Sequence, residues 1–292
     1  MYYMSRKQTG QTNLHTKTIT RGEFKISTVF QGTTSFPRVN PTGPNDTAVQ
    51  ARWWRTTGNN ISIRSAVVMR NNVPYGTPVA NWNVPTAVNG GFFSTSPTNR
   101  RHGTVGSFAI NNGAPVLSSG GITNGSRNYE DIYGLRSPLD FMMDSTNRTR
   151  DGLIVFGNGG GANATITNSL NGNQIQIRDI RWGIGGFDLR MTEADNVFNN
   201  NFRWRHTHAG SLTLRTARTA IGYTGGNATT TNYIVATFSD CQIADVRSFF
   251  RSRGVTTFGL LLDGGGSTQS RNNNTVQDRG DGRNIPTIVA MS

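Results

Sequence analysis

Short apolar or alternating segments, separated by turns rich in glycine and asparagine, recur along the chain from residue 61 onward. Examples are ISIRSAVVM, QIQIRDIRWGIGGFDL and NYIVATFS. Alternation with a period of two residues is typical of strands with one buried face, and short turns between such strands favour antiparallel pairing. The segment GSFAINNGAPVLS, with NNG between two short apolar runs, predicts a hairpin. The pattern therefore predicts a β-rich fold with mostly antiparallel sheets.

One segment, DCQIADVRSFFRSRG, follows the helical period instead. Its isoleucine, valine and two phenylalanines fall on one face of a helix, which Asp240 can cap and Gly254 can end. The predicted helix covers about residues 240–253 and leads to VTTFGLLL, which has the composition of a buried strand. The expected fold class is therefore α+β, with mostly antiparallel sheets and one main helix packed before a buried C-terminal strand.

The first 60 residues differ in composition from the rest. They are polar and contain FPRVNPTGPND, although the paired Trp53 and Trp54 need a surface to cover. We therefore expect a polar N-terminal arm over residues 1–60 and one domain over residues 61–292. The N-terminus lacks the apolar core of a signal peptide, and no stretch approaches the roughly 18 apolar residues that span a bilayer. The expectation is a soluble chain without an ordinary signal peptide.

The chain is strongly basic, with 29 lysines and arginines against 16 acidic residues and a formal net charge of +13. This balance favours anionic partners. The basic residues are scattered, however, with no run longer than two, and only RWRH interleaves aromatic with basic side chains. The distribution is more typical of a solvated surface than of a nucleic-acid groove.

Metal binding and disulfide chemistry have little support in the sequence. Cys241 is the only cysteine, which excludes an intrachain disulfide, and its place beside the predicted helix favours a buried thiol. His206 and His208 are two residues apart, so both rings can lie on one face of a strand. No third ligand follows at standard spacing, and structural zinc takes four ligands. No metal ion or cofactor is therefore predicted.

The stretch LLLDGGGST places Asp263 at the end of an apolar run and follows it with three glycines. Such a loop can bring backbone N–H groups close to an anion, because no Cβ stands in the way. Taken alone, an Asp-Gly-Gly sequence is usually a simple turn. The sequence G-x-x-x-x-G-K-[ST] is missing, which excludes a nucleotide-binding P-loop as the explanation.

Two further segments change this interpretation. AVNGGFF and RTAIG precede LLLDGGGST in this order, with GIGGFDL and the predicted helix at the intervening positions. The combination resembles the phosphodiester glycosidase family over roughly residues 62–292. The chain departs from the family's pattern at Ala217, where proline is usual, and at Leu261, where asparagine is common. The resemblance implies hydrolysis of a sugar that is joined through its anomeric carbon to a phosphodiester.

The resemblance also implies the residues that form the site. Arg218 suits the leaving phosphate because a guanidinium binds phosphate in a bidentate way, and Asp263 suits the developing oxocarbenium ion. Asn89 suits the hydroxyl or N-acyl groups of the sugar. Asp188 is the candidate second carboxylate, although Phe187-Asp188 departs from the family's pattern, in which a small residue or proline is more usual. One carboxylate can suffice, since phosphate is already a good leaving group. The remaining substrate-binding positions implied are Gly90, Gly91, Thr219, Gly264, Gly265, Gly266 and Ser267.

Other interpretations stay open at this point. Asn89 can belong to an ordinary hairpin turn, Arg218 to a strand surface, and Asp263 can merely cap the glycine loop. A function of another class is a non-catalytic protein with the same fold that binds an anionic glycan or forms part of a phage virion. The expected partner of the enzyme is an anionic glycosyl phosphodiester. The sequence leaves open the sugar, the aglycone and the oligomeric state.

Overall fold

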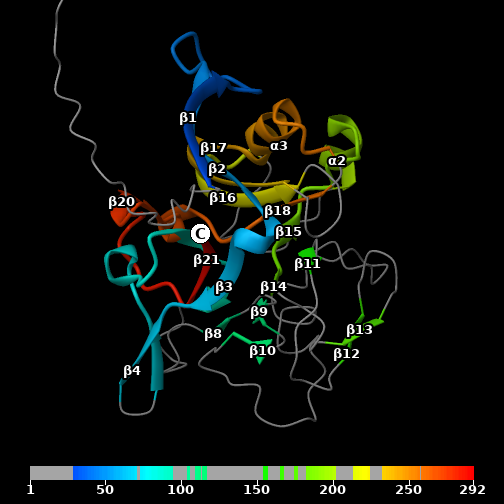
Figure 1. The fold of residues 1–292 in the computed structure, drawn as a ribbon. Coiled ribbons are helices and arrows are strands. Elements are labelled where there is room, and N and C mark those ends of the chain that lie inside the picture. Colours follow the sequence, from blue (N-terminus) through cyan, green and yellow to red (C-terminus); the bar gives the residue numbers. More distant parts are fainter. Residues whose placement is uncertain are drawn as a thin grey trace, which may run out of the picture.

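A computed structural model gives the fold of the chain. It describes residues 29–70, 73–94, 104–105, 109–112, 114–116, 154–156, 165–167, 174–176, 182–201, 213–223, 232–256 and 258–292. This part is β-rich, with antiparallel sheets and two α-helices, α2 (Asp195–Asn201) and α3 (Ile243–Ser252) (Figure 1). The prediction of mostly antiparallel β structure is confirmed.

The larger sheet has six strands in the order β1-β2-β17-β16-β18-β15. Every neighbouring pair in it is antiparallel. The strands are β1 (Phe30–Pro37), β2 (Ala48–Thr57), β15 (Phe187–Asp188), β16 (Thr216–Tyr223), β17 (Asn232–Cys241) and β18 (Phe258–Leu261). The apolar run that precedes Asp263 is therefore an inner strand of the sheet, as the sequence predicts.

The first two strands correct the expected N-terminal arm. β2 pairs with β17 from Thr57↔Asn232 to Ala51↔Phe238, and its Trp54 is fully buried. The alternating apolar side chains of β2 complete the core on both faces of the sheet, so the expected boundary near residue 60 does not hold for residues 30–57. Residues 1–28 lie outside the described residues.

The second sheet has five strands in the order β20-β19-β6-β21-β3. They are β3 (Ile61–Ser65), β6 (Thr86–Asn89), β19 (Ser270–Asn272), β20 (Thr275–Asp278) and β21 (Thr287–Met291). A four-stranded sheet, β10-β9-β14-β11, lies beside it and includes the predicted NNG hairpin, in which Ala114 pairs with Asn111. Its strands are β9 (Ala109–Asn111), β10 (Ala114–Pro115), β11 (Ile154–Phe156) and β14 (Trp182–Ile184).

The remaining elements are short. Three two-stranded pairs consist of β4 (Val67–Arg70) with β5 (Val73–Gly76), β7 (Phe93–Ser94) with β8 (Thr104–Val105), and β12 (Thr165–Thr167) with β13 (Gln174–Gln176). The 3-10 helices are η1 (Gly58–Asn60), η2 (Val79–Asn81) and η5 (Gly265–Ser267). The last of these is the glycine-rich stretch after β18.

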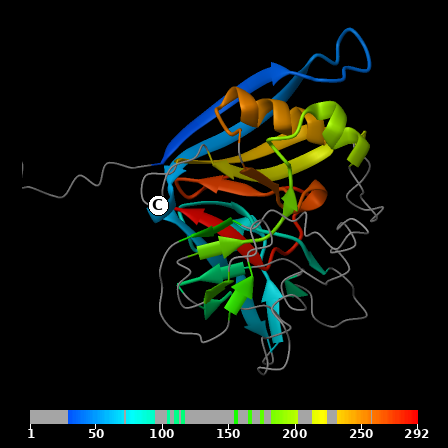
Figure 2. The same cartoon turned by 90° about the vertical axis from the view of Figure 1, so that its right-hand side faces the viewer.

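The two larger sheets face each other across one hydrophobic core (Figure 2). Trp54, Ile221 and Leu260 of the six-stranded sheet pack there with Val88 and Val289 of the five-stranded sheet. The other face of the six-stranded sheet packs against α3 in a second cluster that includes Ala236, Leu261, Val246, Phe249 and Phe250. β18, which ends shortly before Asp263, is thus packed on both of its faces.

The main helix begins later than the sequence predicts. Its N-cap is Gln242, which forms a capping box with Asp245, whereas Asp240 has φ 40° and binds Arg38 through its carbonyl at 2.7 Å. Asp240 is therefore not the cap. Gly254 adopts φ 81° just after the helix, which agrees with the predicted end. No helix in the described residues is long and apolar enough to cross a membrane.

Candidate active site

The three sequence motifs meet at the side chain of Asn89, at the end of β6. Its Oδ1 accepts hydrogen bonds from the Thr219 hydroxyl at 2.6 Å and from the Gln269 backbone N–H at 3.1 Å. Its Nδ2 donates to the carbonyl oxygens of Asp263 at 2.8 Å and Gly90 at 3.2 Å. The amide thus links β6, β16 and both ends of the glycine loop after β18.

These contacts bear on the predicted role of Asn89 as a donor to the sugar. A side-chain amide offers two N–H groups and two acceptor lone pairs, and all four of these positions have protein partners here. Asn89 and Thr219 are both fully buried. Direct contact between the Asn89 amide and a substrate would therefore require the loss of a bond that holds the junction together.

The carboxylate of Asp263 lies half-buried at this junction. Its Oδ1 accepts a hydrogen bond from the Gly264 N–H at 2.9 Å, and the Ser267 hydroxyl also binds the carboxylate. Burial raises the pKa of Asp263 to about 6, against the opposing effects of the Ser267 and Gly264 hydrogen bonds and the Arg283 charge. A partly desolvated carboxylate whose pKa lies close to neutrality is typical of catalytic sites.

The glycines after Asp263 are required by the close packing of this loop. A Cβ on Gly264 would lie 2.9 Å from the Ala217 carbonyl oxygen, and Gly265 has φ 60°, which side chains rarely adopt. Gly266 faces Asp281 and Arg283, which leave no room for a Cβ. The three glycines therefore let the loop lie between β16 and the segment that carries Arg283.

Arg283 is a site residue that the sequence analysis missed. Its Nε and Nη2 donate to the Asp281 carboxylate at 3.0 and 2.5 Å, and its Nη1 donates to the Ser267 hydroxyl at 3.4 Å. A guanidinium has five N–H groups, so two remain beyond these contacts. The side chain is 39% exposed. Gly280 and Gly282 both have positive φ angles, and Gly280 lies against the Gly266 carbonyl, so the segment that carries Arg283 folds back over the glycine loop.

Arg218, predicted as the phosphate ligand, lies beside the loop but is only 2% exposed. It follows a register shift in β16, its Nη2 donates to the Leu214 carbonyl at 3.1 Å, and a Cβ on Gly264 would lie 3.7 Å from its Cδ. Burial lowers the pKa of Arg218, while burial raises the pKa of the Cys241 thiol, which lies near it. Arg218 is thus a buried cation behind the glycine loop, whereas Arg283 is the accessible one.

The other predicted positions lie around this junction with different degrees of access. Gly90 and Gly91 are buried, and the Gly90 N–H donates to the Thr287 carbonyl at 2.7 Å. Asp188 pairs with Leu260 in the backbone register, and its side chain lies outside the described residues. So do His206 and His208. The described residues contain no group of three or more histidines, cysteines, aspartates or glutamates that could hold a metal ion.

Solved structures with a similar fold include the catalytic domain of an enzyme. Zebrafish N-acetylglucosamine-1-phosphodiester alpha-N-acetylglucosaminidase, auto-inhibited by pro-peptide, matches with a TM-score of 0.56 and 16% identity, over 92% of this chain and 84% of that one. A hypothetical protein from Synechocystis matches with a TM-score of 0.45 and 14% identity, over 90% of this chain and 61% of that one. No family model and no curated protein matches the sequence. The similarity to the zebrafish enzyme shows a distant resemblance of fold.

Replacing Asn89 with leucine should destabilise the protein by more than about 3 kcal/mol. The change keeps the volume but leaves the Thr219 hydroxyl, the Gln269 N–H and the Asp263 carbonyl buried without this partner, at about 1–3 kcal/mol each. Urea unfolding measures the loss. Asn199→Leu, at an exposed position of α2, is the matched control and should change stability by less than about 0.5 kcal/mol. Equal stabilities of the two variants would contradict this account of the junction.

Proposed function

We propose that this protein is a hydrolase that cleaves the bond between the anomeric carbon of a sugar and the oxygen of a phosphodiester. The observation that carries the proposal is the environment of Asp263. Its half-buried carboxylate has a raised pKa and lies on a glycine loop beside the accessible guanidinium of Arg283. The distant similarity of fold to a phosphodiester glycosidase catalytic domain supports the same reaction class.

Asp263 acts in this proposal as the carboxylate that faces the anomeric carbon. With a pKa of about 6 it is mostly ionised at neutral pH, so it can stabilise an oxocarbenium-like transition state. The bond from the anomeric carbon to the phosphate oxygen breaks, and the phosphomonoester leaves with both bonding electrons. The oxygen of a water molecule forms the new bond to that carbon, and its proton passes to solvent. Asp188 remains the candidate second carboxylate.

Arg283 holds the departing phosphate in this mechanism. Asp281 fixes the guanidinium from one side, and the two N–H groups beyond its protein contacts can bind phosphate oxygens. Arg218 is assigned a supporting role, since its buried charge lies behind Gly264 and adds positive potential at the loop. Asn89 and Thr219 position the carboxylate, and Gly265, Gly266 and Ser267 shape the surface that receives the diester.

A non-catalytic protein that binds anionic glycans is the second candidate function. The positive net charge and the accessible Arg283 suit it equally well. The desolvated carboxylate favours the hydrolase, because a negative charge close to an anionic ligand weakens binding and is useful when positive charge develops during a reaction.

Incubation with a panel of sugar-1-phosphodiesters should release both a reducing sugar and a phosphomonoester, detected by mass spectrometry. Turnover should rise with pH through about 6, as Asp263 ionises. Asp263→Asn should lower turnover at least about 100-fold, because the amide keeps the size but not the charge. Thermal unfolding of the same samples verifies that the variant is folded. Binding of the diesters without release of either product would favour the glycan-binding protein instead.

Arg283→Gln should weaken the apparent affinity for the diester by about tenfold or more, and Arg283→Lys should recover only part of the loss. Glutamine removes the charge, and lysine lacks the planar pair of donors. Arg279→Gln, an exposed arginine of the same loop, is the matched control for the change in net charge. The measured quantity is KM for the best diester of the panel. An equal effect of the substitutions at residues 279 and 283 would remove Arg283 from the site.

A further inference from the structure

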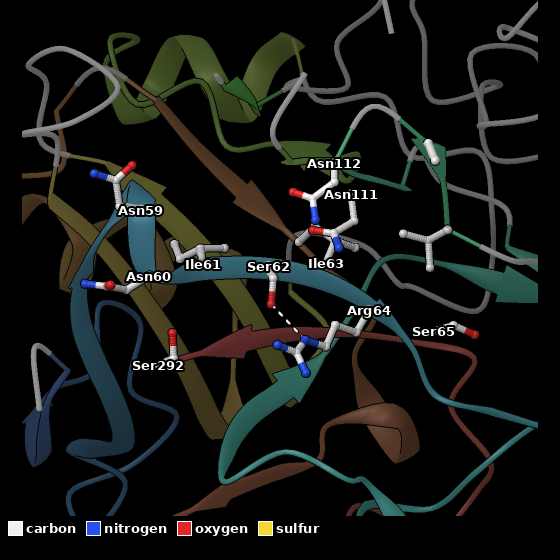
Figure 3. A pocket seen from close by; sticks show the side chains of 12 residues that line it. Asn59, Asn60, Ile61, Ser62, Ile63, Arg64, Ser65, Asn111, Asn112 and Ser292 are labelled. Carbon is white, nitrogen blue, oxygen red and sulfur yellow. Dashed lines mark hydrogen bonds between the residues drawn. The ribbon is translucent and has the colours of Figure 1, made fainter. Parts of the chain in front are cut away.

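A groove with a polar lining follows β3, the edge strand of the five-stranded sheet (Figure 3). Its volume is about 510 Å³. One wall consists of residues 59–65, which include the whole of β3, and the other wall carries Asn111 and Asn112 of the β9–β10 hairpin. In Figure 3 these two asparagines lie across the groove from Ile63 and Ser62. Two separate sheets thus contribute to one surface.

The lining has the chemistry of a sugar-binding surface. Four asparagines and three serines line the groove, and the Asn60 amide already donates to the Thr57 hydroxyl at 2.9 Å. The Asn111 and Asn112 amides on the opposite wall add donors and acceptors, which suit sugar hydroxyls because each of these can also donate and accept. Among the described residues of the lining, Arg64 is the side chain with a charge, and its Nε donates to the Ser62 hydroxyl at 3.0 Å. The buried Ile61 and Ile63 hold the strand against the core from beneath.

The groove begins at the same end of the sheet as the candidate active site. Ser65 of the groove pairs with Thr287 of β21, and the carbonyl of Thr287 accepts the Gly90 N–H. Asn89 pairs with Ile288 of the same strand. β3 and β6 therefore flank β21, and their ends lie about 10 Å apart at the usual spacing between strands. From Ser65 the groove follows β3 away from the active site toward Asn60.

We propose that this groove binds further sugar units of a polymeric glycosyl phosphodiester whose reacting unit lies at Asp263. The inference rests on the proposed function and narrows its substrate class from small diesters to polymers. Arg64 is placed to pair with a phosphate one or more units away from the cleaved bond. β3 spans about 16 Å, which is room for more than one sugar unit.

An extended peptide is the other chemistry that an edge strand can bind. Among the described strands β3 pairs on one side, with β21, so its other edge can accept a strand. Pairing of that kind depends on the backbone and has no need for amide side chains from a second sheet. The amides of Asn111 and Asn112 on the opposite wall therefore favour the sugar polymer.

The test uses the Asp263→Asn variant, which separates binding from turnover. Two probes are titrated by calorimetry: a tetramer of N-acetylglucosamine units joined through 1-phosphodiesters, and the methyl diester of the single unit. The tetramer should bind at least about tenfold more tightly than the single unit. Adding Asn111→Trp, which fills the groove, should abolish this gain and leave binding of the single unit unchanged. Asn199→Trp, on exposed α2, is the matched control and should preserve the gain.

Equal affinities of the two probes, or a gain that survives Asn111→Trp, would overturn the proposal. Displacement of the bound tetramer from the groove by an extended peptide would also overturn it. If the native chain hydrolyses the single-unit diester but the tetramer binds no more tightly than the single unit, the proposed reaction stands and only the role of the groove is rejected. A tetramer gain without hydrolysis of any diester would reject the proposed reaction and leave the groove as a glycan-binding site.

Discussion

The four hydrogen bonds of the Asn89 amide are the interaction on which the site depends. They connect β6 of one sheet with Thr219 of the other, and they fix the glycine loop at Asp263 and at Gln269. A single buried amide with every donor and acceptor paired can hold three chain segments in one arrangement, because any displacement leaves a polar group unsatisfied. The position of the Asp263 carboxylate follows from this junction.

Placing a carboxylate there has a cost in stability. The pKa of Asp263 is raised by burial, so the folded protein binds a proton more tightly than the unfolded chain does. The stability that this group contributes is therefore greatest at low pH and falls as pH rises from about 4 to about 6. At neutral pH the ionised carboxylate costs about 3 kcal/mol relative to a solvated one. Structure that is unfavourable for folding is frequent at catalytic sites, where the same charge is used in the reaction.

Local sequence patterns predict much of the fold, whereas the site depends on contacts between segments that are distant in the sequence. Period-two alternation predicts β17, the NNG turn predicts its hairpin, and Gly254 marks the end of α3, because these features depend on neighbouring residues. The predicted start of α3 was too early by a few residues. Arg38, which directly follows β1, donates to the Asp240 carbonyl, and Gln242 caps the helix instead. Composition alone also hid the strands in residues 30–57, whose pairing partner β17 lies far along the chain.

The candidate site shows the same division. Asn89, Arg218 and Asp263 were selected from motifs, and the structure brings them to one junction but with unequal access to solvent. Arg283 could not be selected, because its contact with Ser267 requires the segment after β20 to fold back over the glycine loop. Arg218 attracted attention because RTAIG is a recognisable motif, yet its burial places it behind the loop. Motifs identify the segments that meet, and only packing decides which side chains face a substrate.

Titration of the Asp263 carboxyl carbon by NMR measures whether the junction holds this carboxylate in a partly desolvated state. Protein labelled with ¹³C-aspartate gives the titration curves, and comparison with Asp263→Asn assigns the signal. We expect a midpoint near pH 6, well above the value of 3.8 for an unperturbed aspartate. A midpoint close to 4 would show an ordinary solvated carboxylate and would contradict the assignment of Asp263 as the reactive group.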